Sequence, residues 1–440
     1  MKALNEGLME ATLESENLRA AWRAVKANRG AAGMDGISVE AFLAHIRPHW
    51  KKVQAKVLAG RYKPAAVKRV YIPKGPGKER PLGIPTVLDR LLQQAMLQVL
   101  QPLFEPRFSE HSYGFRPGRS AHDAVRAAQT FIAAGKDWVV DIDLKSFFDE
   151  VNHDILMQRV AEVIRDKGML RLIARYLRAG VYEDGRVTPT PRGVPQGGPL
   201  SPLLANTYLD ALDKELESRG LSFCRYADDC NIYVGSRKAA DRVFASVTAW
   251  IEKHLKVPVN REKSDSGRPW DRQFLGYQPT KDGRLRPAPK SLERLKSEVR
   301  RRFSGRTSQT SKELRDRWLE YIRGWCNYYA LADAPYWRKD ISQWIRRHIR
   351  KCFWLRWHCA RGRKRKLLHL GVSPRQLRRC PLHGASWPMA KHPAMHTALN
   401  NKTLRAYGLL VPLDFGAHRC RRTQPPDAEN RTSGGVGGGR

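Results

Sequence analysis

The chain has 440 residues, with 80 Lys and Arg against 43 Asp and Glu, so its formal net charge is +37. Its hydrophobic content of 41%, including 12 Trp, is enough to build folded cores and excludes a disordered polycation. No apolar run is long enough to span a bilayer, and seven scattered Cys do not form the pattern of a disulfide framework. We therefore expect a cytoplasmic protein of several domains, with no membrane association and a polyanionic partner, nucleic acid above all.

Helical patterns occur at two places in the first half of the chain. Apolar residues recur with helical spacing over Leu88–Leu100 and over Asp154–Arg165. Asn152 or Asp154 can cap the start of the second helix, because short polar side chains accept hydrogen bonds from the first free backbone N–H groups. These stretches predict two amphipathic helices.

Strand patterns occupy two other stretches of the same region. Trp138–Leu144 (WVVDIDL) and Phe223–Val234 (FCRYADDCNIYV) are rich in β-branched and aromatic residues, and the second contains its own tight turn. A stretch rich in Pro, Pro279–Pro289, follows and is the best candidate for a domain boundary. The sequence thus predicts an α+β region over residues 1–284.

Basic residues concentrate beyond this boundary. Lys290–Cys380 contains 26 Lys and Arg against 7 Asp and Glu, and Ser291–Arg302 and Lys312–Arg350 have helical patterns. Basic residues set among Trp side chains suit a surface that neutralises phosphates and stacks on unpaired bases. Alternatively, the basic residues form an ordinary solvent-exposed helix face, and the Trp side chains pack in the hydrophobic core. We expect a helical domain over 285–365, a basic nucleic-acid-binding segment over 366–415 and a disordered tail over 416–440.

Four carboxylates lie in the two predicted strand regions. Period-two alternation places Asp141 and Asp143 on the same strand face, and Asp228 and Asp229 fall at the predicted turn. An Asp-Asp turn alone is often structural, since Asp hydrogen-bonds locally in turns. If Asp143 faces this turn across a sheet, however, the gathered carboxylates would repel one another unless divalent cations neutralise them. Oxygen-rich sites of this kind suit Mg²⁺.

The order of motifs along the chain is the most specific feature of the sequence. In chain order the motifs are NRGAAGMDG (Asn28–Gly36), YIPKGPGKERPLGIPTVLDR (Tyr71–Arg90), HSYGFRPGRSAHDAV (His111–Val125), DIDLKSFFDEVNHD (Asp141–Asp154), RGVPQGGPLSPLLANTYLD (Arg192–Asp210), YADD (Tyr226–Asp229), FLGY (Phe274–Tyr277), RWLEYIRGWCNYY (Arg317–Tyr329) and LNNKTLRAYGLLVPLD (Leu399–Asp414). This series resembles reverse transcriptases, and in detail the proteins encoded in bacterial group II introns, in the form that lacks the HNH endonuclease domain.

The resemblance implies a fold and an activity. The fold is a right-hand polymerase with fingers and an antiparallel-sheet palm, followed by a helical thumb or maturase domain. The activity is that of an RNA-directed DNA polymerase and maturase, which binds its group II intron RNA, assists splicing and copies the RNA into DNA during intron mobility. Partners are then the intron RNA, a DNA target and primer, and dNTPs, with the protein a monomer or a homodimer. Without an HNH domain, we expect a primer borrowed from the host.

Two alternative functions remain open from the sequence. One is a bacterial reverse transcriptase outside introns, serving defence or sequence diversification, which the maturase-like motif and the end block disfavour. The other is a non-catalytic RNA-binding splicing factor, which the intact Asp143, Asp228 and Asp229 disfavour.

The resemblance also assigns roles to individual residues. It makes Asp143, Asp228 and Asp229, with the backbone carbonyl of Leu144, the ligands of two Mg²⁺ ions, although spacing alone does not separate Asp143 from Asp141. The expected contacts to the incoming nucleotide are Lys74, Arg80, Phe148, Gln196, Gly197 and Lys263. Phe148 would be a steric gate against a ribose 2′-hydroxyl, with Phe147 as the core residue, and Lys263 could instead be an ordinary loop cation.

Positively charged residues in the motifs and in the basic region are the expected contacts to nucleic acid. They are Arg29, Arg116, Arg119, Arg346, Arg347, Arg350, Arg361, Arg363, Lys364, Arg365 and Lys366. The glycine-rich loop around Arg29 resembles one that covers the template strand, or it is a plain interhelical loop.

Overall fold

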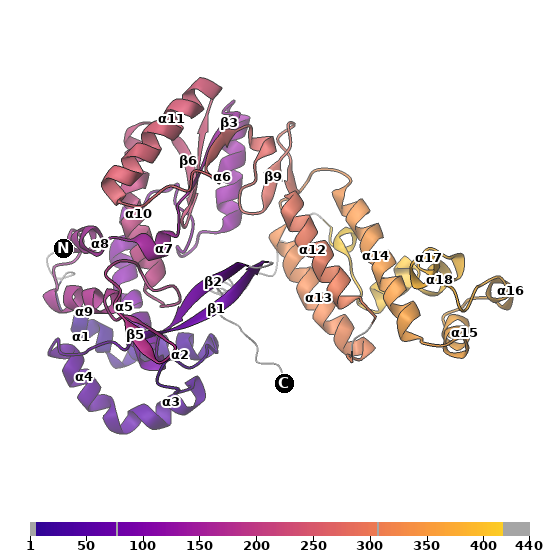
Figure 1. Cartoon of the computed structure of the whole chain (residues 1–440), viewed down its shortest axis with the longest axis horizontal. Coiled ribbons are helices and arrows are strands. Elements are labelled where there is room, and N and C mark those ends of the chain that lie inside the picture. Colours follow the sequence, from indigo (N-terminus) through magenta and orange to yellow (C-terminus); the bar gives the residue numbers. More distant parts are fainter. Residues whose placement is uncertain (1–5, 76–77, 306–307, 417–440) are drawn as a thin grey trace. The chain divides into compact units, whose positions relative to one another are not determined.

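The computed structural model describes residues 6–75, 78–305 and 308–416, which divide into two compact units between Arg268 and Pro269 (Figure 1). The sequence placed this division later, between residues 284 and 285. The difference arises because strand β9 (Tyr277–Pro279) pairs with β10 (Leu285–Pro287), and the backbone N–H of Ala334 donates to the Leu285 carbonyl, so this strand pair is joined to the second unit. Apart from Gly416, the predicted tail lies outside the described residues.

The N-terminal part of the first unit consists of helices around a small mixed sheet. Its elements are α1 (Leu8–Leu13), α2 (Ser15–Ala27), α3 (Val39–Ile46), α4 (Trp50–Leu58), α5 (Val87–Phe104), β1 (Val67–Gly75) and β2 (Lys78–Ile84), joined by β4 (Val181–Glu183) and β5 (Arg186–Thr188). The strand order is β2-β1-β4-β5, and we call this the fingers sheet. Helix α5 contains the predicted helix Leu88–Leu100, and the Thr86 hydroxyl caps it by accepting from the Asp89 N–H.

A second, antiparallel sheet forms the rest of the first unit, and we call it the palm sheet. Its strand order is β6-β7-β3-β8, with β3 (Trp138–Asp143), β6 (Ser222–Tyr226), β7 (Asp229–Val234) and β8 (Asp265–Gly267). The helices of this part are α6 (Ala121–Ala133), α7 (Phe147–Glu150), α8 (His153–Ala161), α9 (Lys167–Leu177), α10 (Ser201–Ser218) and α11 (Arg237–Trp250). The predicted strand and hairpin are therefore confirmed, as is the antiparallel sheet of the expected palm.

Packing holds the palm sheet in place. Helices α6, α10 and α11 contact its strands (Figure 1). One hydrophobic core joins Val140 and Ile142 of β3 to Leu209 of α10 and Leu92 of α5. Asn152 caps α8 by accepting from two backbone N–H groups, which confirms the predicted start of that helix. The sheet edge where β3 ends is thus fixed by a buried core behind it.

The second unit is helical except for β9 and β10 among its described residues. Its main helices are α12 (Pro289–Arg302), α13 (Ser311–Tyr328), α14 (Trp337–Arg356) and α15 (Ala360–His369), followed by the short helices α16 (Pro374–Arg378), α17 (Ser386–Met389), α18 (Pro393–Ala398) and α19 (Asn401–Ala406). The helical pattern over Lys312–Arg350 is confirmed, and it is formed by two helices, α13 and α14, separated by residues 329–336. The chain leaves the first helix after Tyr328, and Pro335, which cannot continue a helical hydrogen-bond ladder and disfavours helical geometry at Ala334, lies between the two helices.

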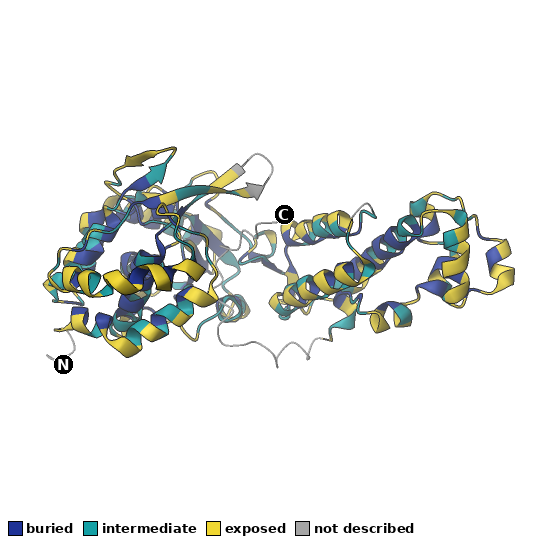
Figure 2. Ribbon diagram, turned by 90° about the horizontal axis from the view of Figure 1, so that it is seen from below, coloured by how far each residue is buried: buried dark blue, intermediate teal, exposed yellow. Residues whose placement is uncertain are grey.

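The basic segment 366–415 is part of the core of the second unit. Leu367, Met395 and Val411 are buried in the same cluster as Trp318 and Trp354 of the long helices. Figure 2 shows the resulting pattern, in which helices of this unit carry a buried stripe on one face and exposed residues on the other. Segment 366–415 therefore buries most of its apolar side chains in the core of the second unit and exposes its Lys and Arg side chains.

Candidate active site

The carboxylates of the palm sheet meet at one end of two neighbouring strands. Strand β3 ends at Asp143, β7 begins at Asp229, and these two residues are directly opposed in the antiparallel register. Directly opposed residues carry their side chains on the same sheet face, with Cβ atoms about 5 Å apart. Asp228 lies in the turn between β6 and β7, next to Ala227, whose φ of 58° is left-handed. Asp143 therefore lies opposite the last residue of the YADD motif, which is the condition under which the sequence pattern favours a cation site.

Asp143 is held by its backbone and balanced by a cation. Its N–H donates to the Ser264 hydroxyl at 2.8 Å, and its carbonyl accepts from the Asn260 N–H at 2.9 Å. The Lys263 ammonium lies 3.3 Å from both carboxylate oxygens, with the Asp143 side chain 29% exposed and that of Lys263 60% exposed. An ion pair this exposed is worth no more than about 1 kcal/mol, so it can separate easily.

The donor chemistry at this edge fits a divalent cation. Carboxylate oxygens are the hard ligands that Mg²⁺ prefers, and Asp143 already attracts a positive charge. Within the described parts of the chain, however, no three His, Cys, Asp or Glu side chains form a group that could hold a metal as they stand. The assignment of Asp143, Asp228, Asp229 and the Leu144 carbonyl as metal ligands therefore stays a prediction.

The register distinguishes the two aspartates that the sequence could not separate. Asp141 lies within β3, opposite Asn231 on one side and Asp265 on the other. Asp143 alone of the two is opposite the residue that leaves the turn. Leu144 follows it with a buried side chain and forms a bridge to Val259.

Three of the predicted nucleotide contacts lie together at strand β2 of the fingers sheet: Arg80, Gln196 and Gly197. The Arg80 guanidinium donates to the Gln196 side-chain oxygen at 3.0 Å, and the Gly83 N–H donates to the Gln196 carbonyl at 2.7 Å. A Cβ on Gly197, whose φ is 121°, would lie 2.3 Å from the Gly83 carbonyl oxygen. Backbone packing against β2 therefore requires a glycine at position 197. The sequence predicted a contact between Gly197 and a nucleotide, but it did not predict this packing.

Two further residues, Phe148 and Lys74, were also predicted to contact the nucleotide. Phe147 and Phe148 both lie in the first unit's core, with ring centroids 5.3 Å apart, and Phe148 is the more exposed, at 8% against 2%. Lys74 lies in β1, and its side chain lies outside what the structure describes. The roles of these residues stay predictions.

Burial corrects three of the predicted nucleic-acid contacts. Arg116 donates to the carbonyls of Ser109 and Ser112 and pairs with Glu105. In the second unit, Arg346 pairs with the buried Asp414 at 2.8 Å, and Arg350 donates to the Leu399 carbonyl at 3.0 Å. Because all three arginines are buried and bonded within the chain, they stabilise the fold and are not part of a phosphate-binding surface.

The other predicted contacts lie nearer to solvent. Arg361, Lys364, Arg365 and Lys366 are exposed on α15. Arg363 on the same helix stacks over Trp354 at 4.4 Å, and Arg347 stacks over Trp387 at 3.7 Å, so both also have structural contacts. Arg29 lies in the interhelical loop, and the Arg119 guanidinium donates to the Glu110 carbonyl. These positions leave α15 as the most concentrated basic surface among the predicted contacts.

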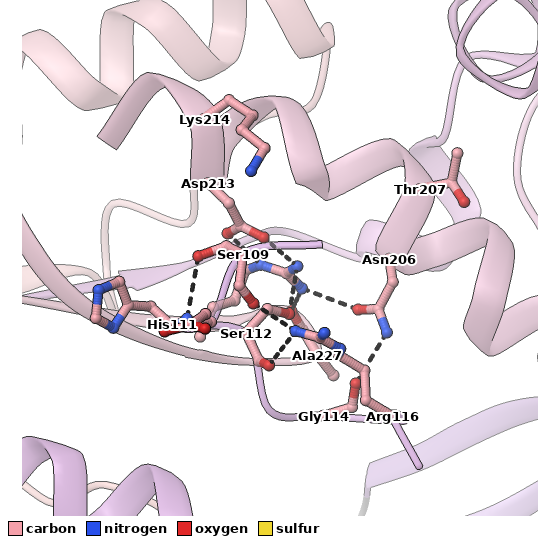
Figure 3. A network of polar contacts seen from close by, with 12 residues as sticks. Ser109, His111, Ser112, Gly114, Arg116, Asn206, Thr207, Asp213, Lys214 and Ala227 are labelled. Atoms are coloured by element: carbon pink, nitrogen blue, oxygen red, sulfur yellow. Dashed lines mark hydrogen bonds and ion pairs between the residues drawn. The ribbon is translucent and has the colours of Figure 1, made fainter. Parts of the chain in front are cut away.

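Sequence reasoning did not single out Arg225, the residue before YADD. Its guanidinium is fully buried, and it bonds to Asp213 of α10 and to the carbonyl of Ala227 in the turn. Figure 3 shows Asp213, Asn206, Ser112 and Ala227 gathered around this network. Burial opposes the charge on Arg225, but the carboxylate of Asp213 more than offsets this, so the pKa of Arg225 stays raised. A charged residue inside an otherwise apolar strand was the signal available in the sequence.

Comparisons with known proteins agree with this architecture. Residues 72–279 match the family described as reverse transcriptase (RNA-dependent DNA polymerase), and residues 292–371 match the group II intron, maturase-specific domain. The chain is 33% identical over 297 residues to protein YkfC of Escherichia coli, covering 58% of this chain and 78% of that protein. It is 42% identical over 176 residues to the group II intron-encoded protein LtrA of Lactococcus lactis, covering 40% of this chain and 29% of LtrA.

Among solved structures, a telomerase from Candida albicans covers 88% of this chain and 69% of its own, with a TM-score of 0.44 and 13% identity. The match to YkfC covers most of that relative, whereas the chain spans less than a third of LtrA. The two domain matches follow one another in the order that the motifs predicted. The chain therefore belongs to the family of group II intron reverse transcriptases and maturases.

Proposed function

We propose that the chain is an RNA-directed DNA polymerase and intron maturase, which binds a group II intron RNA, assists its splicing and copies it into DNA. The observation that carries the polymerase half is the direct opposition of Asp143 and Asp229 beside the Asp228 turn, inside a segment that matches reverse transcriptases. The maturase-specific match favours an intron RNA over the defence and diversification alternatives.

In the proposed reaction, a primer 3′-hydroxyl attacks the α-phosphate of a paired dNTP and pyrophosphate leaves. A pair of Mg²⁺ ions bound by Asp143, Asp228, Asp229 and the Leu144 carbonyl would supply charge neutralisation at the reacting phosphate. The protein itself forms no covalent bond in this reaction. Its contribution is to align the primer 3′-hydroxyl with the α-phosphate of the dNTP.

The residues around the carboxylates have separate proposed tasks. Ser264 and Asn260 fix the backbone of Asp143, which limits where its carboxylate can lie. Lys263, which pairs with Asp143, would be released if a metal took its place and would then be available to the triphosphate. Arg80 and Gln196, already bonded to each other, would meet the nucleotide from the fingers side. Phe148 would exclude the 2′-hydroxyl of a ribonucleotide.

Primer extension tests the polymerase half. The wild-type protein should extend a DNA primer on an RNA template with Mg²⁺, and Asp228→Ala should abolish extension because a metal ligand is lost. Asp265→Ala is the matched control, since it removes an exposed carboxylate from the neighbouring strand β8 of the same sheet. Equal extension by wild type and Asp228→Ala would refute the assignment of the triad.

Salt dependence tests the RNA-binding half. Each phosphate neutralised adds about 0.7 to 0.9 to the slope of log affinity against log salt, so Lys364→Gln should reduce that slope by about one unit for intron RNA. The matched control is Lys391→Gln, which removes an exposed cation of the same unit from outside α15. An unchanged slope in Lys364→Gln would exclude Lys364 as a phosphate contact.

A further inference from the structure

We propose that the buried Arg225 is a positioning residue that sets the geometry of the YADD turn and thereby of the metal ligands Asp228 and Asp229. This inference rests on the proposed polymerase function. It goes beyond that function because Arg225 touches neither nucleotide nor metal ligand side chain in the proposed reaction and acts through the backbone of the turn.

The contacts of Arg225 link the turn to helix α10. Its Nε and Nη2 atoms donate to the two carboxylate oxygens of Asp213 at 2.7 and 2.5 Å, a bidentate pair whose side chains are 1% and 0% exposed. Its Nη1 atom donates at 2.8 Å to the carbonyl of Ala227. A planar guanidinium with two nitrogens fixed on a helix leaves the third little freedom, so the Ala227 carbonyl is held at a set position.

A second set of contacts links Arg225 to the loop that contains Ser112 and Gly114. The Ser112 hydroxyl accepts from Arg225 Nη2 at 2.7 Å, and the Asn206 side chain accepts from Nη1 at 3.1 Å while donating to the Gly114 carbonyl at 2.9 Å. Figure 3 shows Ser112, Gly114 and Asn206 beside Ala227. The loop that contains Ser112 and Gly114 is therefore tied to α10 through the same guanidinium.

Backbone packing makes this arrangement tight. A Cβ on Gly114 would lie 2.3 Å from the backbone nitrogen of Ala227 and 3.0 Å from the carbonyl carbon of Tyr226. The N–H of Tyr113 donates to the Arg225 carbonyl at 2.8 Å, and the Arg225 N–H donates to the His111 carbonyl at 2.9 Å. The turn thus lies directly against the loop, and neither can move without the other.

The turn needs such support because of its backbone conformation. Ala227 has a left-handed φ of 58°, which a residue with a Cβ adopts only where its surroundings impose it. The residue after it is Asp228, so a relaxed Ala227 would re-aim the Asp228 carboxylate. The buried Arg225–Asp213 pair holds that conformation, in addition to any effect on stability.

The test compares Arg225→Lys with Arg175→Lys in the full-length protein. Arg175 also donates to two backbone carbonyls, those of Gly60 and Tyr62, which do not belong to the turn. Both substitutions should lower the thermal midpoint. Only Arg225→Lys should lower kcat by about tenfold or more, with an unchanged KM for the primer-template and a raised Mg²⁺ concentration at half-maximal rate, because small misplacements of reacting groups slow catalysis strongly.

A second variant decides the matter if Arg225→Lys does not fold. Gly114→Ala leaves the ion pair intact and pushes on the turn directly, and we expect the same loss of kcat and the same shift in Mg²⁺ dependence. If Gly114→Ala and any folded Arg225 variant extend primers with wild-type kcat and Mg²⁺ dependence, the positioning role is refuted while the polymerase assignment stands. Failure of the wild-type protein to extend any primer would instead refute the proposed function.

Discussion

Two pairs of aspartate and cation beside the palm sheet differ in almost every physical respect. At its end, Asp143 meets Lys263 at 3.3 Å, and both side chains are partly open to solvent. Behind the turn, Asp213 meets Arg225 at 2.5 Å, with both side chains buried. A lysine provides a mobile point charge in the first pair, and an arginine provides a rigid fork in the second.

The difference shows that an ion pair that separates easily and an ion pair that stays closed can lie beside the same sheet. The exposed pair contributes little stability, so a metal ion or a nucleotide can displace the ammonium at small cost. The buried pair cannot be opened without leaving a charge in the interior. Substitutions at these two pairs, and at Asp210 on the same helix as Asp213, should make this contrast measurable, with the largest effect at Asp143.

Asp143→Asn should reduce the rate of primer extension by about 10³-fold or more, since the metal ligation proposed for Asp143 would supply several kcal/mol at the reacting phosphate. Its free energy of unfolding should change by less than about 1 kcal/mol, because only an exposed ion pair is lost. Extension assays with urea unfolding measure both quantities. A near-normal rate would remove Asp143 from the catalytic group.

Asp213→Asn should lower the free energy of unfolding by about 3 to 5 kcal/mol, since it strands the buried Arg225 charge. Chemical denaturation measures this loss. The control is Lys214→Ala on the same helix, which breaks an exposed pair with Glu217 and should cost under about 1 kcal/mol. Similar losses in the two variants would mean that the buried pair is not the more costly one to break.

Lys263→Ala should tighten Mg²⁺ or Mn²⁺ binding in the absence of nucleotide by up to about fivefold, because the ammonium that competes for Asp143 is gone. Lys263→Arg keeps the charge and should leave metal affinity nearly unchanged. Calorimetric titration of the nucleotide-free protein measures the effect. Weaker metal binding in Lys263→Ala would contradict the competition.

The smallest effect on stability is expected from Asp210, which lies on the same helix as Asp213. Its carboxyl differs from those of Asp143 and Asp213 because it has no cation partner among the ion pairs of the described residues. Burial and the neighbouring Asp213 raise the pKa of Asp210 to about 6, and its buried Oδ1 atom lacks a hydrogen-bond partner among the described residues. Because the folded pKa exceeds the unfolded one, the neutral form favours folding below about pH 4, and this contribution is lost as pH rises to about 6.

Asp210→Asn keeps a neutral side chain at every pH, so it isolates that contribution. The stability of the wild type relative to this variant should fall between about pH 4 and pH 6 and stay level above. Thermal unfolding of both proteins across this range measures the difference. A parallel pH dependence would mean that Asp210 titrates normally.

Local signals in the sequence were enough for much of the first unit. Helical periodicity located α5, and strand composition with period-two alternation located β3 and the hairpin that brings Asp229 opposite Asp143. These features depend on residues close together in the chain, where propensity and pattern act directly.

Long-range contacts explain what the sequence could not supply. Whether an arginine faces solvent depends on the carbonyl or carboxylate that folding brings to it, as with Arg350 and the Leu399 carbonyl, or Arg346 and Asp414. A count of charges treats these residues like the exposed Lys364. The boundary near residue 268 was missed for the same reason, since it depends on pairing between β9 and β10 and on their contact with Ala334.

The indole N–H groups of two buried tryptophans have a consequence for the order of events during synthesis. Trp318 donates to the Leu410 carbonyl at 2.8 Å, and Trp354 donates to the Gly384 carbonyl at 2.9 Å. The second unit therefore cannot complete its interior until the ribosome has released almost all of it, whereas the core of the first unit closes with Val259. A nascent chain would present a finished palm while its maturase half is still open, so RNA that arrives early would meet the two halves at different stages of maturity.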